Sequence, residues 1–169
     1  MKRLRGFCGA LLAVAVAAGV GLLLRQYGFG LVRVAGVSME DTLRGGDLTL
    51  VTRFDYFNSA PRRGDVVECR FPGREDAYIK RVIGLPGDRV AFMDGQLLLN
   101  GAPVDEPYVL TPTDDYVVTL DNGEYLALGD NRAESYDSRM DDMGPISRAD
   151  ILGRVRWIIL PLSRFGPIK

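Results

Sequence analysis

The sequence predicts a mainly β protein: a single N-terminal transmembrane helix followed by an all-β domain that forms a folded sheet or a barrel. An uncharged apolar run covers residues 7–24. Beyond it, apolar residues alternate in short runs separated by Gly, Asp and Asn, and no stretch longer than a turn or two has helical periodicity. We therefore expect a cytoplasmic N-terminus (residues 1–6), a membrane anchor (7–24) and an extracytoplasmic β-rich domain (25–169).

The apolar run has the length and the flanks of a retained anchor. Three basic residues precede it, Arg25 ends it, and as a helix its 18 residues would reach roughly 27 Å, enough for a bilayer core. A cleavable signal peptide is the main alternative, but its apolar run is usually about 7–15 residues and ends in small residues. This run ends in three leucines. A buried core helix is disfavoured because no polar face interrupts the segment. The basic N-terminal flank predicts a single-pass protein of the cytoplasmic membrane with its domain outside.

Charge and composition exclude several classes of protein. The net charge is −1, and residues 1–25 carry +4, so the outer domain is acidic and no nucleic-acid partner is expected. The chain has no histidine, which excludes a Ser-His-Asp triad, a Cys-His pair and a His-ligated metal. Cys8 lies in the apolar run and Cys69 in an alternating run, so we expect no disulfide and a core position for Cys69.

The outer domain has the pattern of consecutive short strands. Dipeptides Asp94-Gly95 and Asn122-Gly123 predict two-residue hairpins. The stretch 101–115, with three prolines, predicts a long surface connection. The expected strands are 48–53, 66–70, 78–84, 90–92, 97–100, 116–120, 124–128 and 151–159.

Lys80 is the first candidate for chemistry. Of the 21 basic residues only three are lysines, and Lys80 is the only one away from the chain ends. Alternation along a strand places it on one apolar face with Tyr78 and Val82. Loss of hydration there lowers the pKa of the amine, which can then act as a general base. A lysine that snorkels at a sheet edge is the alternative; arginine at every other internal basic position favours the base.

A base requires a nucleophile, and the outer domain has six serines. Ser38 follows an apolar stretch, stands two residues after Gly36, and is 14 residues from Leu24, within about 50 Å of extended chain. Composition alone leaves it one candidate among six, since a serine near glycine is usually a turn residue. The segment 129–142 is dense in Asp, Asn, Arg and Ser, which is typical of a structural hydrogen-bond network. A Ca²⁺ loop is disfavoured because the spacing is not that of an EF-hand.

Three segments resemble bacterial type I signal peptidases: residues 36–43 (GVSMEDTL), residues 63–67 together with 78–88 (RGDVV, YIKRVIGLPGD), and residues 129–139 (GDNRAESYDSR). The similarity runs from about Val32 to Arg139, with a looser tail to Ile159. The single span and small size resemble the short form common in Gram-positive bacteria. The resemblance implies a β-rich, membrane-bound serine endopeptidase without metal or organic cofactor, which removes signal peptides from exported proteins.

The resemblance also implies residue roles. Ser38 would be the nucleophile, Lys80 the general base and then the acid for the leaving amine, and Ser135 would orient the Lys80 amine. The Ser38 N–H would donate to the oxyanion; Gly36 stands where some relatives have a hydroxyl donor, so backbone groups would form the hole. The expected supporting residues are Asp130, Arg132, Asp137, Arg139 and Arg81, and the expected substrate-contacting residues are Val34, Ala35, Met39, Tyr78 and Ile79.

The implied substrate is an extended segment of an exported preprotein, with small side chains one and three residues before the cut, paired against an exposed strand edge. The lipid bilayer and a secretion translocon are the other implied partners. Phe54, Tyr56 and Phe57 would either dip into the membrane interface or pack in the core.

Two departures from the family pattern and three alternatives remain. Asp41 stands where relatives usually have proline, and Met143-Gly144 where they tend to have an aromatic-glycine pair. A self-cleaving repressor with a Ser-Lys site is disfavoured by the membrane span. A dedicated peptidase for a narrow set of clients such as pilins, and a catalytically silent tethered β-domain that only binds exported chains, stay open.

Overall fold

The computed structural model describes residues 14–22 and 28–168 of the chain. Residues 14–22 are helical. Within the described residues, no helix has the length and apolar content needed to cross a bilayer. Half of the predicted anchor, residues 7–13 together with 23 and 24, and the predicted cytoplasmic residues 1–6 lie outside the described residues, so both stay predictions.

The rest of the described chain forms two antiparallel sheets joined through the β4–β5 and β8–β9 connections. The larger sheet has the order β1-β2-β11-β3-β4-β9-β10, with β12 paired to β11. Its strands are β1 (Phe29–Arg33), β2 (Leu48–Thr52), β3 (Val66–Cys69), β4 (Tyr78–Gly84), β9 (Glu124–Leu128), β10 (Ile146–Ser147), β11 (Ile151–Leu160) and β12 (Gly166–Pro167).

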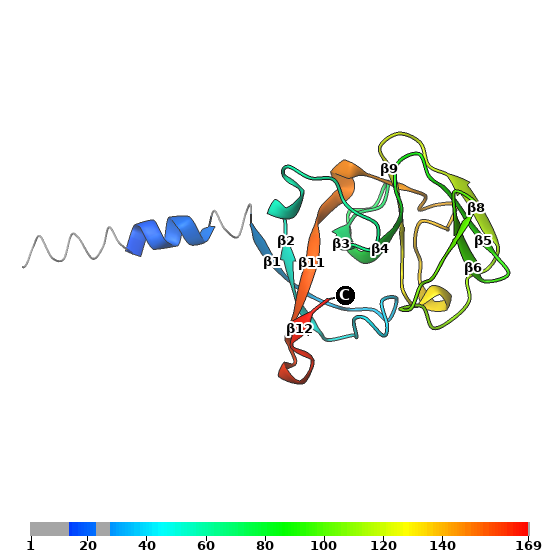
Figure 1. Cartoon of the computed structure of the whole chain (residues 1–169). Coiled ribbons are helices and arrows are strands. Elements are labelled where there is room, and N and C mark those ends of the chain that lie inside the picture. Colours follow the sequence, from blue (N-terminus) through cyan, green and yellow to red (C-terminus); the bar gives the residue numbers. More distant parts are fainter. Residues whose placement is uncertain (1–13, 23–27, 169) are drawn as a thin grey trace, which may run out of the picture.

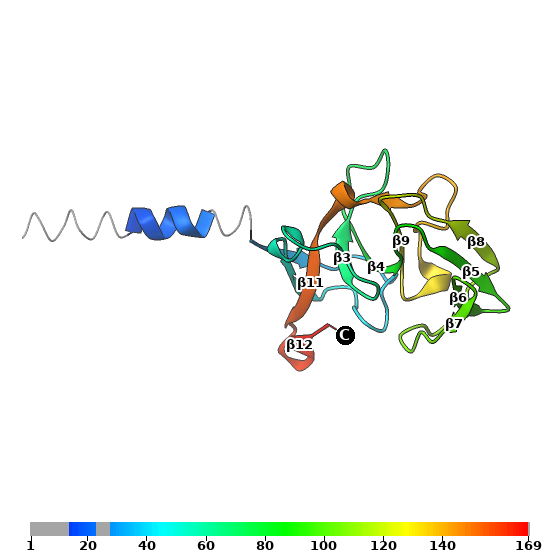
Figure 2. The ribbon, with the colours of Figure 1, turned by 45° about the horizontal axis from the view of Figure 1, so that its top comes forward.

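The smaller sheet has the order β7-β6-β5-β8. Figure 1 shows it at the opposite end of the β domain from β1 and β2, and the turned view in Figure 2 shows its strands together beyond β9. Its strands are β5 (Arg89–Met93), β6 (Gln96–Leu99), β7 (Ala102–Val104) and β8 (Tyr116–Thr119). Four short 3₁₀ helices lie between strands: η1 (Phe54–Tyr56), η2 (Arg132–Glu134), η3 (Arg148–Asp150) and η4 (Leu162–Arg164).

The larger sheet buries both of its faces, which explains why β3 is buried along its whole length. Val67 and Cys69 point into one apolar cluster, together with Val82 and Ile146. Val66, the neighbour of Val67, points into a second cluster on the other face. Alternation along a strand places consecutive side chains on opposite faces. Such a doubly covered strand favours apolar residues at consecutive positions, as at Val66 and Val67, and Glu68 is the one polar residue of β3. The predicted core position of Cys69 is confirmed.

All eight predicted strands are present, and the bounds of β4 and β9 agree with the prediction at both ends. The Asp94-Gly95 hairpin is also confirmed: Met93 pairs with Gln96, and both turn residues have positive φ. β1, β7, β10 and β12 were not expected.

One local prediction was wrong, and a second was right only in part. The Asn122-Gly123 turn exists, with the Glu124 N–H donating to the Asp121 carbonyl, but it does not close a hairpin. The flanking strands belong to different sheets, because β8 pairs with β5 and β9 pairs with β4. The stretch 101–115 is not wholly a surface connection. It contains β7, where Pro103 is tolerated on an edge strand, and Thr113, which is buried.

The aromatic residues around η1 were expected either at the membrane interface or in the core, and they differ in burial. Tyr56 is buried in the cluster with Val67 and donates a hydrogen bond to Asp65. Phe54 and Phe57 are exposed. Met143, at the second departure from the family pattern, is buried in the same cluster as Tyr56 and fills that part of the core.

Candidate active site

The segment after β1 holds Ser38 between two buried anchors. Met39 is 2% exposed and Leu43 is fully buried, and the Leu43 N–H donates to the Met39 carbonyl at 2.7 Å. Upstream, Val34 and the 46–47 turn exchange two backbone hydrogen bonds. The segment is thus tied to the core on both sides of Ser38, and these contacts hold the backbone of Ser38 in place.

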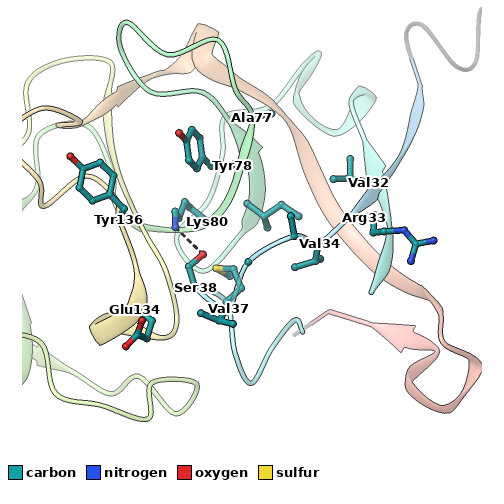
Figure 3. Close-up of a pocket in the computed structure, with 14 residues that line it drawn as sticks. Val32, Arg33, Val34, Val37, Ser38, Ala77, Tyr78, Lys80, Glu134 and Tyr136 are labelled. Carbon is teal, nitrogen blue, oxygen red and sulfur yellow. Dashed lines mark hydrogen bonds between the residues drawn. The ribbon is translucent and has the colours of Figure 1, made fainter. Parts of the chain in front are cut away.

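Lys80 lies on β4 with its amine between two serine hydroxyls. Its Nζ is 3.0 Å from Ser38 Oγ and 3.0 Å from Ser135 Oγ. Figure 3 shows the Ser38 and Lys80 side chains pointing toward one another. Lys80 is 2% exposed. Burial lowers the pKa of this amine, although the nearby Asp137 carboxylate opposes the shift. The structure therefore brings together the serine and the lysine that the sequence singled out, with the amine in an environment that favours its neutral form.

Ser135 is itself held in a fixed orientation. Its hydroxyl donates to Asp137 Oδ2 at 2.5 Å and accepts from the Gly129 N–H at 3.1 Å. Because the hydroxyl proton goes to Asp137, the Ser135 oxygen is left to accept from the Lys80 amine. This arrangement directs an N–H of Lys80 toward the Ser135 oxygen.

Asp137 is a buried carboxylate with a strong partner. Burial by itself raises its pKa, but the hydrogen bond and the charge of Arg139 outweigh burial and hold the pKa of Asp137 below its usual range. Arg139 Nε lies 2.8 Å from Asp137 Oδ1. The Asp137 carboxylate is therefore ionised at neutral pH, as an acceptor for the Ser135 hydroxyl should be.

Asp130 and Arg81 form a second buried ion pair behind the dyad. Arg81 binds both carboxylate oxygens, at 2.8 and 2.7 Å. The two side chains are 2% and 0% exposed. Thr42 donates to the same carboxylate at 2.5 Å. This pair joins β4, the segment of the nucleophile and the segment after β9, so it supports the site without touching Ser38 or Lys80.

Arg132 occupies a different place from the other expected supporting residues. Its guanidinium donates to the Gly129 carbonyl, to Thr113 and to both oxygens of Glu106. It joins the segment after β9 to the 101–115 connection. Three acids of the 129–142 segment form ion pairs, each with an arginine: Asp130 with Arg81, Asp137 with Arg139 and Asp142 with Arg74. The hydrogen-bond network expected for this segment is confirmed.

Two residues of the site were missed by sequence reasoning. Asn131 donates its backbone N–H to the Ser38 carbonyl at 3.0 Å and its side-chain amide to the Val37 carbonyl at 3.3 Å. Gly129 packs directly on the site, since a Cβ at this position would overlap Ser38 O and Ser135 Oγ. Both lie in the GDNR motif, but their action on the backbone of Ser38 depends on a contact across some 90 residues. Asp41, at the first departure from the family pattern, is exposed and forms an ion pair with Arg44 outside this network.

A groove of about 500 Å³ runs past Ser38 and Lys80. All five residues expected to contact substrate line it: Val34, Ala35, Met39, Tyr78 and Ile79. In Figure 3, Val32 and Val34 lie on one side of Ser38, and Glu134 and Tyr136 lie on the other. The groove has a polar backbone edge as well as apolar walls. Residues 78–80 of β4 pair with β3 on one side, whereas pairing with β9 on the other side begins only at Arg81.

A serine hydroxyl beside a buried amine, in a β fold whose sequence has no histidine, is the constellation of Ser-Lys hydrolases. Comparison with known proteins gives the family. The model of the family described as signal peptidase, peptidase S26, matches residues 8–160. The chain belongs to this family, and it is a hydrolase of peptide bonds.

Individual relatives agree with the family match. A signal peptidase I of Leptolyngbya laminosa is 34% identical over 93% of this chain and 79% of its own length. A signal peptidase I of Bacillus amyloliquefaciens is 32% identical over 93% of this chain and 90% of its own length. The crystal structure of a signal peptidase I from Enterococcus faecalis superposes with a TM-score of 0.52 at 30% identity, covering 57% of this chain and 97% of that one. This kinship supports the cleavage of signal peptides from preproteins.

Proposed function

We propose that the protein cleaves N-terminal signal peptides from exported preproteins at the outer face of the bacterial cytoplasmic membrane, with Ser38 as nucleophile and Lys80 as general base. The observation that carries the proposal is the 3.0 Å separation of Lys80 Nζ and Ser38 Oγ, with the amine buried. Arginine could not replace this lysine, because a guanidinium does not deprotonate in proteins.

In the acylation step, neutral Lys80 takes the proton of Ser38 as Oγ attacks the carbonyl carbon of the scissile bond. The protonated amine then gives that proton to the leaving nitrogen, the C–N bond breaks, and the mature protein leaves with a free amino terminus. The signal peptide stays as an ester on Ser38. Water attacks this ester with Lys80 again as base, which releases the signal peptide as a carboxylic acid and restores the Ser38 hydroxyl.

Ser135, Asp137 and Arg139 act through Lys80. The Ser135 oxygen accepts an N–H of the amine at 3.0 Å and so keeps its lone pair aligned with Ser38. The negative charge of Asp137 stabilises the ammonium that forms during the reaction, which offsets part of the cost of a buried cation. The oxyanion of the tetrahedral intermediate is bound by the Ser38 N–H, and Gly36 contributes no side-chain donor, so the hole consists of backbone groups.

The substrate adds as an extended strand to the open edge of β4 at residues 78–80. Backbone hydrogen bonds at a strand edge bind any sequence, so specificity comes from the side chains that point into the groove. These alternate along an extended peptide, which selects the first and third residues before the cut. Val34, Ala35, Met39, Tyr78 and Ile79 form shallow apolar walls that admit small side chains.

The location at the membrane is supported by the apolar run at 7–24 and by exposed aromatic residues near the start of β1. Phe29 and Phe54 pack edge to face with their ring centroids 5.2 Å apart, and both remain partly exposed, as does Phe57. Rings at the point where the chain leaves the apolar run are suited to the lipid interface. The site would then act on preproteins as they emerge from a translocon.

Cleavage of a purified preprotein by the full-length protein in lipid vesicles tests the proposal. Ser38→Ala and Lys80→Arg should each abolish cleavage while the thermal unfolding transition is retained. Ser163→Ala and Lys2→Arg make the same chemical changes elsewhere in the chain and should cleave like the unchanged protein. Cleavage at the unchanged rate by Lys80→Arg would refute the role of Lys80 as base.

A further inference from the structure

Glu68 on β3 is a buried acid with one carboxylate oxygen that has no hydrogen-bond partner among the described residues. Glu68 is only 8% exposed, and its Oε2 is buried with no hydrogen bond. Burial raises the pKa of this carboxyl, against the lowering influence of Arg53 and Arg70. Burying a polar group without a hydrogen bond is unfavourable, and native proteins keep few such groups. Such an oxygen can accept a hydrogen bond from a bound ligand.

The sheet register places Glu68 next to the groove. Glu68 pairs with Ile79 of β4, so both side chains lie on the same face of the sheet. Ile79 lines the groove and packs against the cluster that contains Val34 and Val66. On its other side Glu68 is next to Gly153 of β11, where Val51 and Arg53 fill the space that a side chain would take.

An extended substrate on the open edge of β4 would bring one particular side chain to this place. Its inward side chains share the face of Ile79, and they belong to the first and third residues before the cut. The first lies at Ser38. The third lies about 7 Å further upstream, toward Val32 and over the Ile79–Glu68 pair.

We propose that Glu68 forms a polar floor in the subsite for the third residue before the cut and selects a small hydrogen-bond donor there, serine or threonine, over alanine or valine. This inference rests on the proposed function and names a substrate preference of the same site. The apolar walls restrict the size of the side chain, and the carboxyl adds a requirement for polarity. A bound hydroxyl gives the carboxyl the partner it lacks, whereas a bound alanine leaves it unpaired.

The preference is measured with two preprotein substrates that differ only by serine or alanine at the third position before the cut. One hydrogen bond to a buried acceptor predicts a kcat/KM for the serine substrate about 3- to 10-fold higher. In Glu68→Leu the ratio should fall to 1 or below, while Glu68→Gln, which keeps an acceptor oxygen, should retain most of it. Glu75→Leu removes an exposed acid just before β4 and should leave the ratio as in the unchanged protein.

A second readout does not depend on catalysis. Since the unpaired carboxyl destabilises the free protein, Glu68→Leu should raise the melting temperature, which a carboxyl with a purely structural role would not do. Equal cleavage of both substrates by the unchanged protein, or an unchanged ratio in Glu68→Leu, would overturn the inference while leaving the proposed function intact. Failure of the unchanged protein to cleave either substrate would instead refute the proposed function.

Discussion

Replacement of Gly129 by alanine should disable the site by displacement alone, because it removes no functional group. A Cβ at this position would lie 2.6 Å from the Ser135 Cβ and would overlap Ser38 O and Ser135 Oγ. Carbon atoms in contact are normally about 3.5–4.0 Å apart. Ser135, Ser38 or both must therefore move by about 1 Å, and a misplacement of that size costs about 100-fold in rate.

The same clash has an energetic cost in the folded protein. Overpacking of a well-packed core costs about 1–3 kcal/mol, which corresponds to a fall of roughly 3–10 °C in melting temperature for a domain of this size. The assay is kcat/KM on a signal-peptide substrate together with thermal unfolding of the same preparation. Gly166→Ala is the matched control, since a Cβ there meets no atom within 4 Å. A Gly129→Ala protein with unchanged kcat/KM would refute the view that this glycine lets β9 approach the nucleophile.

The remaining predictions concern the charges around Lys80. Cleavage should fall as the pH drops through the lowered pKa of Lys80, because the protonated amine cannot accept a proton. Asp137→Asn removes a charge that raises the pKa of Lys80, so it should move this acid limb of the pH–rate profile to lower pH. A profile without an acid limb would contradict the mechanism. Lys80→Met should raise the melting temperature at neutral pH while abolishing cleavage. The pKa of Lys80 is lower in the folded than in the unfolded protein, so its cost in stability appears below the unfolded pKa of about 10.4 and is complete below the folded pKa. A lower melting temperature of Lys80→Met would argue against a desolvated amine. Arg81→Met should reduce the free energy of unfolding by about 3–5 kcal/mol, because it leaves Asp130 as an unpaired buried charge; urea unfolding measures this, and a loss below about 1 kcal/mol would not fit a buried pair.

The strands that sequence reasoning found are those whose signals are local. β4 and β9 alternate clearly, and the Asp94-Gly95 turn requires positive φ at both of its residues. The strands it missed are short or lie at sheet edges, and their existence depends on distant partners: β10 pairs over two residues with β9, and β12 over two residues with β11. The Asn122-Gly123 turn is the instructive case, because the local conformation was right and the pairing was wrong. Turn chemistry is a property of a few residues, whereas strand pairing depends on which other strand is available.

The candidate site divides in the same way. Six serines were equal by composition, and the fold brings two of them, Ser38 and Ser135, to 3.0 Å from the Lys80 amine. Of these two, Ser38 lines the groove. The contacts of Gly129 and Asn131 with the backbone of Ser38 also required the fold. Glu68 lies in the expected strand 66–70, and the burial of its Oε2 without a hydrogen bond is visible only in the folded chain.

The amino-acid sequence alone determined which kind of chemistry this protein can perform. A chain without histidine and with one internal lysine has a single cationic side chain able to give up its proton near neutral pH, and that is a matter of composition. Only the tertiary structure decided which hydroxyls that amine meets and which acids surround it. Proximity, desolvation and hydrogen-bond geometry arise when segments far apart in the chain pack together, and none of them is a property of any one segment.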